Sequence, residues 1–419
     1  MIQLLKSNFS LLKSFSSYTL VNLLNAGIPF LLLPFLTNYL TPADYGILSN
    51  VNATFMLIVP LIGVAISGAV SRQYVNEDID LSIYISSCLR ILVINTALLF
   101  ITLLLIGEWL SELTNIPVQF LIALPFYAVI HNLIEMVLAL FRMKNQPFLY
   151  GVFRISRTTI EIALSVFLIL RFEMDWSGRF YGMVIAAFLG FIVAAFYLWK
   201  MKYLVLSFNK NYVKKFLHFG LPLIPHALSG ALIMYSDKII VTEMLGISEN
   251  GIYSVAFQIG MVIALFQNSF NQAWVPFFFK KLKENFDKQK MVKVTYIYFL
   301  ALLALTAGLW LITPIIFKFI NHNFTEGSSF VFWIGLGFAF NGMYKMMVNY
   351  IMFEERTKYV AIITLTTAAV NIILNIIFIN YYGLLGAAIA STISFAIQFI
   401  LSWIICSKIY PMPWFSFNR

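Results

Sequence analysis

The sequence predicts an all-α membrane protein, with twelve transmembrane helices in two pseudo-symmetric six-helix lobes around a central cavity. The first observation behind this fold class is composition: 61% of the 419 residues are hydrophobic and 11% are charged, against about 25% charged in a typical soluble domain. The second is the number of long apolar runs, and the third is an internal repeat. The composition excludes the soluble globular classes.

The predicted helices follow from apolar runs of about 20 residues or more, the length that crosses the hydrocarbon core of a bilayer. Short polar connections separate the runs, and none of them is long enough to form a soluble domain. The runs cover residues 17–40, 45–71, 81–107, 118–140, 150–171, 179–199, 219–245, 251–276, 292–317, 328–352, 358–380 and 384–408.

The orientation follows from the Lys and Arg residues, which concentrate in cytoplasmic loops of membrane proteins. Of the 28 such residues, twenty-two lie at the termini or in even-numbered loops and three, Arg171, Arg179 and Lys318, lie in odd-numbered loops. Both termini are therefore expected in the cytoplasm. The net charge of +10 then reflects topology and attraction to anionic lipid headgroups, and nucleic acid is not expected as a partner.

A repeat relates the two halves of the chain. The segment 37–49 (TNYLTPADYGILS) recurs 205 residues later as 242–254 (TEMLGISENGIYS), where Thr, Leu, an acid, Gly, Ile and Ser coincide. Six helices per half is an even number, so the halves enter the membrane from the same side and are parallel repeats. We expect an N-terminal lobe at 1–199, a Lys-rich cytoplasmic linker at 200–218 and a C-terminal lobe at 219–419.

Ionisable residues inside the predicted helices are candidates for function, because a charge at the bilayer centre costs at least about 2.5–3.5 kcal/mol. The three basic residues that remain after the loop count above, Arg90, Lys238 and Lys345, lie inside predicted helices. Structural ion pairing is the alternative: Arg157 lies four residues before Glu161, and Arg90 lies on a helix next to that of Glu135. Asn, Ser and Thr in the spans are otherwise typical of hydrogen bonding between helices.

The remaining chemistry is sparse. Cys88 and Cys406 lie in separate apolar runs, and the four His residues have no ligand spacing, so we expect neither a metal, a cofactor nor a disulfide. No catalytic motif is present, and an enzyme is not expected.

Four passages together resemble one family. They are GLPLIPHALSGALIMYSDKIIVTEMLGISENGIYS at 220–254, GVAISGAVSR at 63–72, NQAWVP at 271–276 and YGLLGAA at 382–388. Their order and spacing are similar to those of bacterial lipid-linked oligosaccharide (O-antigen) flippases, polysaccharide biosynthesis proteins of the multidrug/oligosaccharidyl-lipid/polysaccharide exporter superfamily. The resemblance covers essentially the whole chain.

The resemblance implies a function in lipopolysaccharide biosynthesis at the bacterial cytoplasmic (inner) membrane. Undecaprenyl-pyrophosphate-linked O-antigen repeat units would move from the cytoplasmic to the periplasmic leaflet by alternating access, driven by membrane potential, ion antiport or both. Expected partners are this lipid-linked oligosaccharide, membrane lipids, a polysaccharide polymerase and a chain-length regulator.

Two sets of residues are candidates for this function. Cations and amides suited to an anionic sugar lipid are expected to line the cavity, and other ionisable residues are expected to act in coupling or gating. The cavity set is Arg90, Lys345, Arg72, Arg154, Asn341 and Asn25; the coupling or gating set is Glu135, Glu161, His226, Asp237 and Lys238.

Other functions remain open. A drug/cation antiporter of the same superfamily would need a carboxylate deep in its N-terminal lobe, where the first span has Asn22 and Asn25 and no acid. A membrane-bound polysaccharide polymerase or glycosyltransferase would carry a large outward loop, which the sequence lacks. A lipid II flippase would be expected to have fourteen spans.

Overall fold

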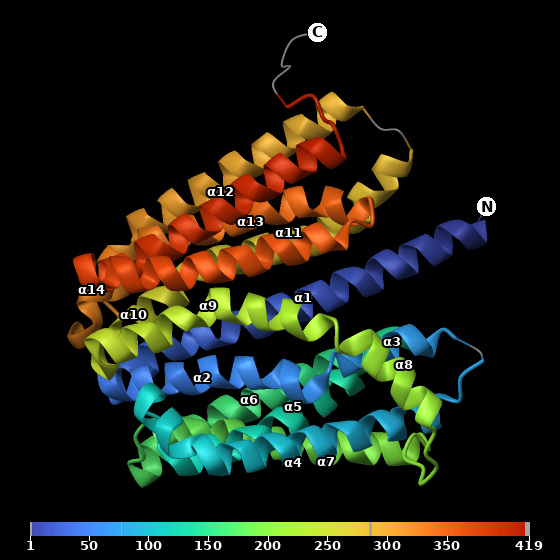
Figure 1. Ribbon diagram of the computed structural model, residues 1–419, viewed down its shortest axis with the longest axis horizontal. Helices are drawn as coiled ribbons and strands as arrows, with labels where there is room; N and C mark the ends of the chain where they lie inside the picture. Colours follow the sequence, from blue (N-terminus) through green and yellow to red (C-terminus); the bar gives the residue numbers. More distant parts are fainter. Residues whose placement is uncertain (1, 77, 285–286, 415–419) are drawn as a thin grey trace. The chain divides into compact units, whose positions relative to one another are not determined.

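A computed structural model describes the backbone of residues 2–76, 78–284 and 287–414, and their side chains from residue 20 onward except Leu23. Throughout these residues the regular structure is helical, with no strand (Figure 1). The predicted all-α class is confirmed.

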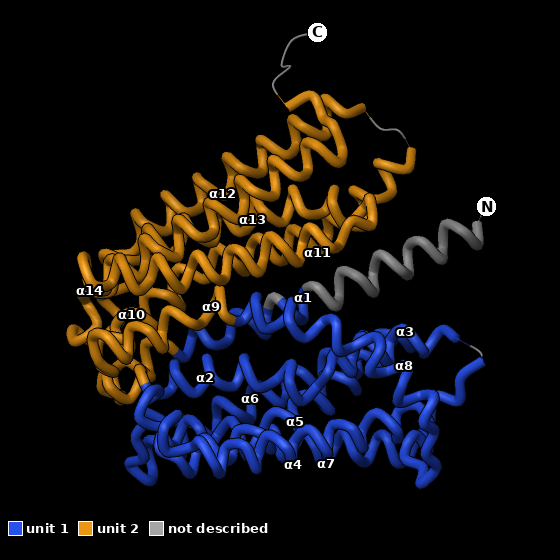
Figure 2. The backbone as a smooth tube through the Cα atoms, in the orientation of Figure 1, with its two compact units in different colours: residues 1–32, 47–231 blue, residues 33–46, 232–419 orange. Residues whose placement is uncertain are grey.

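Two compact units make up the chain (Figure 2). Unit 1 comprises residues 1–32 and 47–231, and unit 2 comprises residues 33–46 and 232–419. The units therefore do not follow the chain strictly, since a short segment around the first helix joint packs within unit 2. The lobe boundaries expected from the sequence stay a prediction.

Unit 1 is built on long helices that lie side by side, with two shorter helices at one end. Three of its helices, α1, α2 and α9, continue into unit 2. The bounds are α1 (Ile2–Tyr39), α2 (Pro42–Gly63), α3 (Ile66–Tyr74), α4 (Leu81–Thr114), α5 (Val118–Met143), α6 (Pro147–Phe172), α7 (Trp176–Lys200), α8 (Lys210–Gly220) and α9 (Leu223–Leu245).

Unit 2 is also helical, and α13 packs along α14. Its remaining elements are α10 (Ile247–Gly260), α11 (Val262–Lys283), α12 (Lys288–Phe317), the 3₁₀ helix η1 (His322–Ser329), α13 (Val331–Phe353) and α14 (Thr357–Ile409).

The number of membrane-spanning helices agrees with the predicted twelve. Among the described residues, 10 helical stretches are long and apolar enough to cross a membrane. One of them, α14, is two helices joined at Gly383, whose φ of 57° and ψ of −138° are not helical. A further helix, α6, has 26 residues but carries several charged side chains. Some of these side chains line the pocket described below.

A left-handed turn interrupts one of the predicted helices. The run 45–71 was expected to be continuous, but α2 ends at Gly63 and α3 begins at Ile66. Between them, Val64 and Ala65 have φ values of 44° and 54°, a left-handed conformation that L-residues rarely adopt. The expectation of a single helix is wrong here, because hydrophobicity reports burial and not backbone direction.

The two copies of the sequence repeat meet inside unit 2. They lie at the α1–α2 and α9–α10 joints, as predicted. A Cβ placed on Gly251 would collide with the Pro42 carbonyl and lie 3.1 Å from the Gly46 nitrogen. The Asn250 side chain also donates a hydrogen bond to the Gly46 carbonyl at 3.2 Å. The equivalent glycines of the two repeats therefore allow a close helix contact.

We expect Gly251→Ala to destabilise unit 2, because backbone atoms of Pro42 and Gly46 cannot move aside as a side chain can. Overpacking of this kind costs about 1–3 kcal/mol. The matched control is Gly308→Ala on α12, where a Cβ meets nothing within 4 Å and should be neutral or stabilising. Thermal unfolding of the purified variants measures both effects, and equal melting temperatures would contradict the close contact.

Candidate functional site

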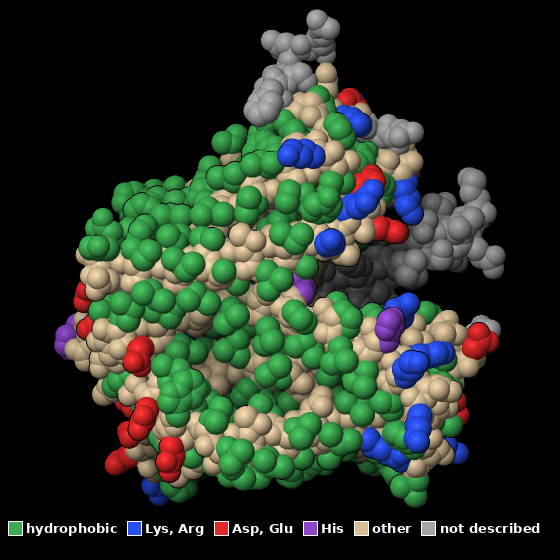
Figure 3. Space-filling model, viewed as in Figure 1, with side chains coloured by type: hydrophobic (Ala, Val, Ile, Leu, Met, Phe, Trp, Pro, Cys, Tyr) green, Lys and Arg blue, Asp and Glu red, His purple; other side chains and the backbone are tan. Residues whose placement is uncertain are grey.

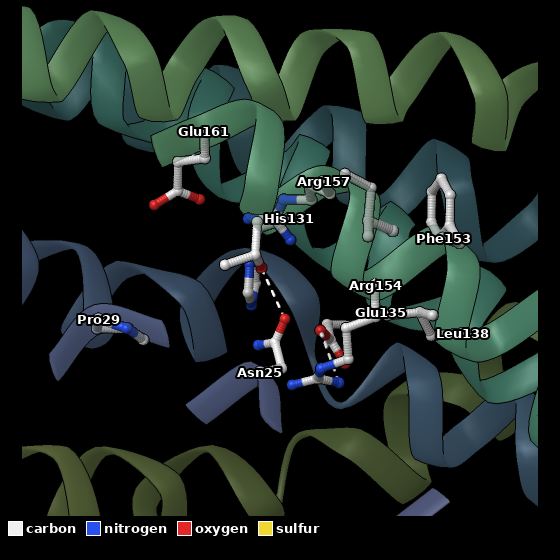
Figure 4. Close-up of a pocket in the computed structure, with 11 residues that line it drawn as sticks. Asn25, Pro29, His131, Glu135, Leu138, Phe153, Arg154, Arg157 and Glu161 are labelled. Atoms are coloured by element: carbon white, nitrogen blue, oxygen red, sulfur yellow. Dashed lines mark hydrogen bonds and ion pairs between the residues drawn. The ribbon is translucent and has the colours of Figure 1, made fainter. Parts of the chain in front are cut away.

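A polar pocket lies within unit 1, where α1, α5 and α6 meet (Figure 4). Its volume is about 220 Å³. The residues that line it come from three helices that the sequence predicts as membrane spans. They are Asn25, Pro29, His131, Ile134, Glu135, Leu138, Phe153, Arg154, Arg157, Thr158 and Glu161.

Helical spacing brings these side chains to one place. His131 and Glu135 are four residues apart on α5, and Arg154, Thr158 and Glu161 follow one face of α6. A hydrogen bond attaches α1 to α6, because Thr158 donates to Asn25 at 2.7 Å. Figure 4 draws this bond as a dashed line that ends on Asn25.

A second hydrogen-bonded chain runs beside the first. The Tyr150 hydroxyl donates to Asn22 Oδ1 at 2.7 Å and accepts a hydrogen bond from Arg154 at 2.9 Å. Asn22 and Asn25, which the sequence leaves without partners, thus hold α1 against α6.

Two ion pairs neutralise the carboxylates of the pocket. Arg154 lies 3.8 Å from Glu135, with side chains 30% and 29% exposed. Arg179 lies 2.7 Å from Glu161, with side chains 14% and 15% exposed. The alternative in which Arg157 pairs with Glu161 does not hold, because Arg179 of α7 takes that carboxylate.

Arg157 of α6 has a side-chain hydrogen bond with Tyr127 of α5 rather than with a carboxylate. None of the ion pairs found among the described residues includes Arg157, and its buried Nε has no hydrogen-bond partner there. The Nδ1 atom of His131 in the same pocket is also buried without a partner. With Arg179, which pairs with Glu161 from outside the pocket lining, three guanidinium groups stand against two carboxylates. This excess of positive charge makes the pocket suitable for an anion.

Sequence reasoning missed Arg179, which it assigns to an outer loop. The structure begins α7 at Trp176, so Arg179 lies in a helix and also donates to Ser165 at 3.0 Å. A Cβ on Gly182 would collide with the Ser165 side chain and backbone, so this glycine lets α7 approach α6 closely. The glycines at 178 and 182, one helical turn apart, were the signal of that contact.

Two predicted cavity cations lie elsewhere in unit 1. Arg90 donates a hydrogen bond to the Leu206 carbonyl in the loop after α7, and does not reach Glu135 as one alternative held. Arg72 is exposed at the end of α3, with its guanidinium carbon 5.5 Å from the centre of the Phe219 ring. The structure does not bring either residue into the pocket.

Unit 2 has a smaller polar cluster on α11 and α13. The Lys345 ammonium donates to Asn268 Oδ1 at 2.5 Å, and Asn349 donates to Asn271 at 3.1 Å. Among the described residues, no carboxylate lies within ion-pair distance of Lys345. Further along α13, Asn341 donates to Gln398 of α14 at 3.4 Å.

The Asp–Lys pair of α9 is buried. Asp237 accepts a hydrogen bond from the Tyr253 hydroxyl at 2.6 Å and lies 3.6 Å from the Lys238 ammonium. That ammonium stands 3.3 Å from the centre of the Phe257 ring, a cation–π arrangement. These contacts attach α9 to α10, whereas His226 is exposed near the start of α9. Gating by these three residues stays a prediction.

The architecture defines a class of protein. The chain is a multi-pass membrane protein with the fold of the multidrug/oligosaccharidyl-lipid/polysaccharide exporter superfamily. An inward-facing multidrug transporter of the MATE family matches with a TM-score of 0.75 and 17% identity over 94% of this chain and 95% of that chain. The lipid II flippase MurJ, in an inward closed conformation, matches with a TM-score of 0.72 and 16% identity over 95% of this chain and 86% of that chain.

The chain belongs to the polysaccharide biosynthesis protein family, which matches residues 11–282. The predicted family is thus confirmed. The capsular polysaccharide biosynthesis protein CapF of Staphylococcus aureus is 23% identical over 96% of this chain and 100% of that protein. An uncharacterized membrane protein of Haemophilus influenzae is 23% identical over 90% of this chain and 94% of that protein.

We expect Arg179→Ala to destabilise the protein strongly, because it leaves the mostly buried Glu161 carboxylate without its partner. Breaking one side of a buried pair costs about 3–5 kcal/mol. Arg179→Ala combined with Glu161→Ala should recover part of that loss, and the double-mutant cycle in thermal unfolding measures the coupling. The control pair is Lys280 and Glu284, exposed and 3.9 Å apart, where removal of the lysine should have little effect. Equal costs at both pairs would contradict the assignment.

Proposed function

We propose that this protein moves lipid-linked oligosaccharides across the membrane, with the anionic pyrophosphate held by cations inside its helices. The observation that carries the proposal is the excess of intramembrane cations over carboxylates. Arg157 in the pocket and Lys345 on α13 have no ion-pair partner among the described residues. Such charges in a membrane span need a functional or structural reason, and an anionic cargo supplies one.

The chemistry of these groups fits a pyrophosphate bearing sugars. Guanidinium groups replace the hydration of phosphate oxygens with charge-assisted hydrogen bonds. Amide side chains donate to and accept from sugar hydroxyls, and Asn268, Asn271 and Asn349 lie around Lys345. Cation and amide together form a subsite suited to the boundary between pyrophosphate and sugar.

The finer assignment is an undecaprenyl-pyrophosphate-linked repeat unit of O-antigen, carried to the periplasmic leaflet of the inner membrane by alternating access. Both termini would be cytoplasmic. Family membership and the similarity to a capsular polysaccharide protein support a polysaccharide precursor as cargo. A polymerase and a chain-length regulator would act on the product on the far side.

A drug/cation antiporter is the alternative, and the MATE-like fold is the observation that favours it. Such a transporter needs a carboxylate that is available to a cation or a proton. Glu135 and Glu161 already face Arg154 and Arg179, so a cationic drug would compete with arginine for either one. This arrangement favours the anionic cargo.

We expect Arg157→Gln and Lys345→Gln each to reduce polysaccharide display about tenfold or more, because a hydrogen bond to a charged group contributes about 1.5–3 kcal/mol. Complementation of a strain lacking this gene, with immunoblots for O-antigen and for capsule, measures display and separates the two polysaccharides. Arg171→Gln and Lys318→Gln, exposed at the ends of α6 and α12, are the controls. Normal display by either Arg157→Gln or Lys345→Gln at normal membrane levels would show that the substituted residue does not bind the cargo.

We also expect a membrane potential to direct transport in vesicles. An anion leaving a compartment that is negative inside gains about 2.3 kcal/mol per charge per 100 mV. With purified protein in proteoliposomes, a potassium diffusion potential that is negative inside should therefore cause a fluorescent lipid-linked oligosaccharide to accumulate in the outer leaflet. Proton-driven extrusion of a cationic dye, with no flipping of the lipid, would favour the antiporter instead.

A further inference from the structure

The loop between α7 and α8 presents an exposed apolar ridge. Leu204, Leu206 and Phe208 alternate along it and are 42%, 96% and 49% exposed. Val205 and Ser207 separate them, and the backbone bends at Leu206. A leucine that is almost completely exposed serves no packing role within the chain.

The ridge is held in position by serine side chains of α4. The Ser86 hydroxyl donates to the Tyr203 carbonyl at 3.0 Å and accepts from the Val205 amide at 2.9 Å. The Ser87 hydroxyl accepts from the Asn209 amide at 3.3 Å. The loop backbone is thus fixed while its apolar side chains point outward.

Arg90 completes this attachment one turn further along α4. It donates a hydrogen bond to the Leu206 carbonyl, at the centre of the ridge. Its guanidinium carbon also lies 5.2 Å from the centre of the Phe208 ring. Arg90, which lies inside a predicted membrane span, therefore positions an exposed loop.

Positive charge surrounds the ridge. Residues 200–220 contain no Asp or Glu, and five lysines occur there: Lys200, Lys202, Lys210, Lys214 and Lys215. All five are exposed, whereas Phe216 on the inner face of α8 is fully buried. In Figure 3, Lys and Arg side chains gather at the end of unit 1 where α8 lies, and Asp and Glu gather at the opposite end.

We propose that this loop and α8 form an interfacial anchor for anionic phospholipids. Leu204, Leu206 and Phe208 enter the boundary between headgroups and acyl chains, and the lysines bind the phosphates around them. An apolar edge bordered by lysines is the pattern of segments that lie in a membrane interface. Trp199 is 67% exposed at the end of α7, and indole rings are enriched at membrane interfaces. The anchor is independent of the proposed cargo.

The first test measures the depth of the ridge in a bilayer. Full-length protein with Cys88→Ala and Cys406→Ala receives Leu206→Cys, is labelled with the environment-sensitive dye NBD, and is placed in nanodiscs of phosphatidylglycerol and phosphatidylcholine. We expect several-fold brighter, blue-shifted emission that is quenched by lipids spin-labelled near the headgroup. The control is Gln289→Cys, exposed at the start of α12, which should report water.

Water-like emission at position 206 in every lipid mixture would overturn the anchor. So would emission that shifts only when a second protein is added, since that result assigns the ridge to a protein partner. Substitution of Arg90 by Ala in the labelled protein should broaden the NBD emission band, because the ridge then loses its central attachment to α4.

The second test addresses the lysines. Each lysine near an anionic surface contributes about fivefold in affinity. The triple variant Lys210→Gln, Lys214→Gln and Lys215→Gln should therefore require a higher phosphatidylglycerol fraction for the same emission. The matched control replaces Lys280, Lys281 and Lys283 by Gln at the end of α11 and should behave like the parent protein. Identical titrations for both triple variants would contradict a role of these lysines.

Discussion

The cost of placing charge in hydrocarbon governs the interior of this protein. Each carboxylate that lines the pocket of unit 1 is matched by an arginine from a different helix: Glu135 by Arg154 and Glu161 by Arg179. In unit 2, Asp237 is satisfied by the Tyr253 hydroxyl and by Lys238. A buried ion pair is a weak source of stability by itself, but a lone partner would be far worse. These pairs therefore specify which helices must be neighbours.

The same constraint identifies the residues that are left over. Once the pairs are assigned, Arg157 and Lys345 are the cations of the two polar clusters that have no carboxylate partner in the described part of the chain. Neither cation is needed to neutralise a carboxylate, whereas a cavity that binds an anion needs such cations. The distinction between cations with and without a carboxylate partner thus selects the candidate binding residues from the many polar residues of the spans.

Close backbone approach is the second feature on which the fold depends. Gly46 and Gly251 meet where the two repeats meet, and Gly182 lets α7 approach α6. Without that approach, Arg179 would not reach Glu161. Small residues at helix contacts and polar residues beside them work together here, because hydrocarbon offers no hydrophobic force to hold helices against each other.

Much of the architecture could be read from the sequence. Composition and run length determined the membrane class and the twelve spans, and the repeat located the joints at 37–49 and 242–254. Periodicity also placed Asn25, Glu135, Arg154 and Glu161 on faces that the structure brings together. The left-handed break at Val64 and Ala65 escaped detection, because apolar residues continue through it.

Tertiary structure alone decided the partners. Helical periodicity determines which face a residue occupies, but not which helix that face will meet. Glu161 therefore paired with Arg179, eighteen residues away on the next helix, and not with the nearby Arg157. Arg90 shows the same limit: its depth in an apolar run indicated a cavity, whereas its reach is to a loop carbonyl more than a hundred residues further along the chain. Such contacts depend on long-range packing, which no local pattern encodes.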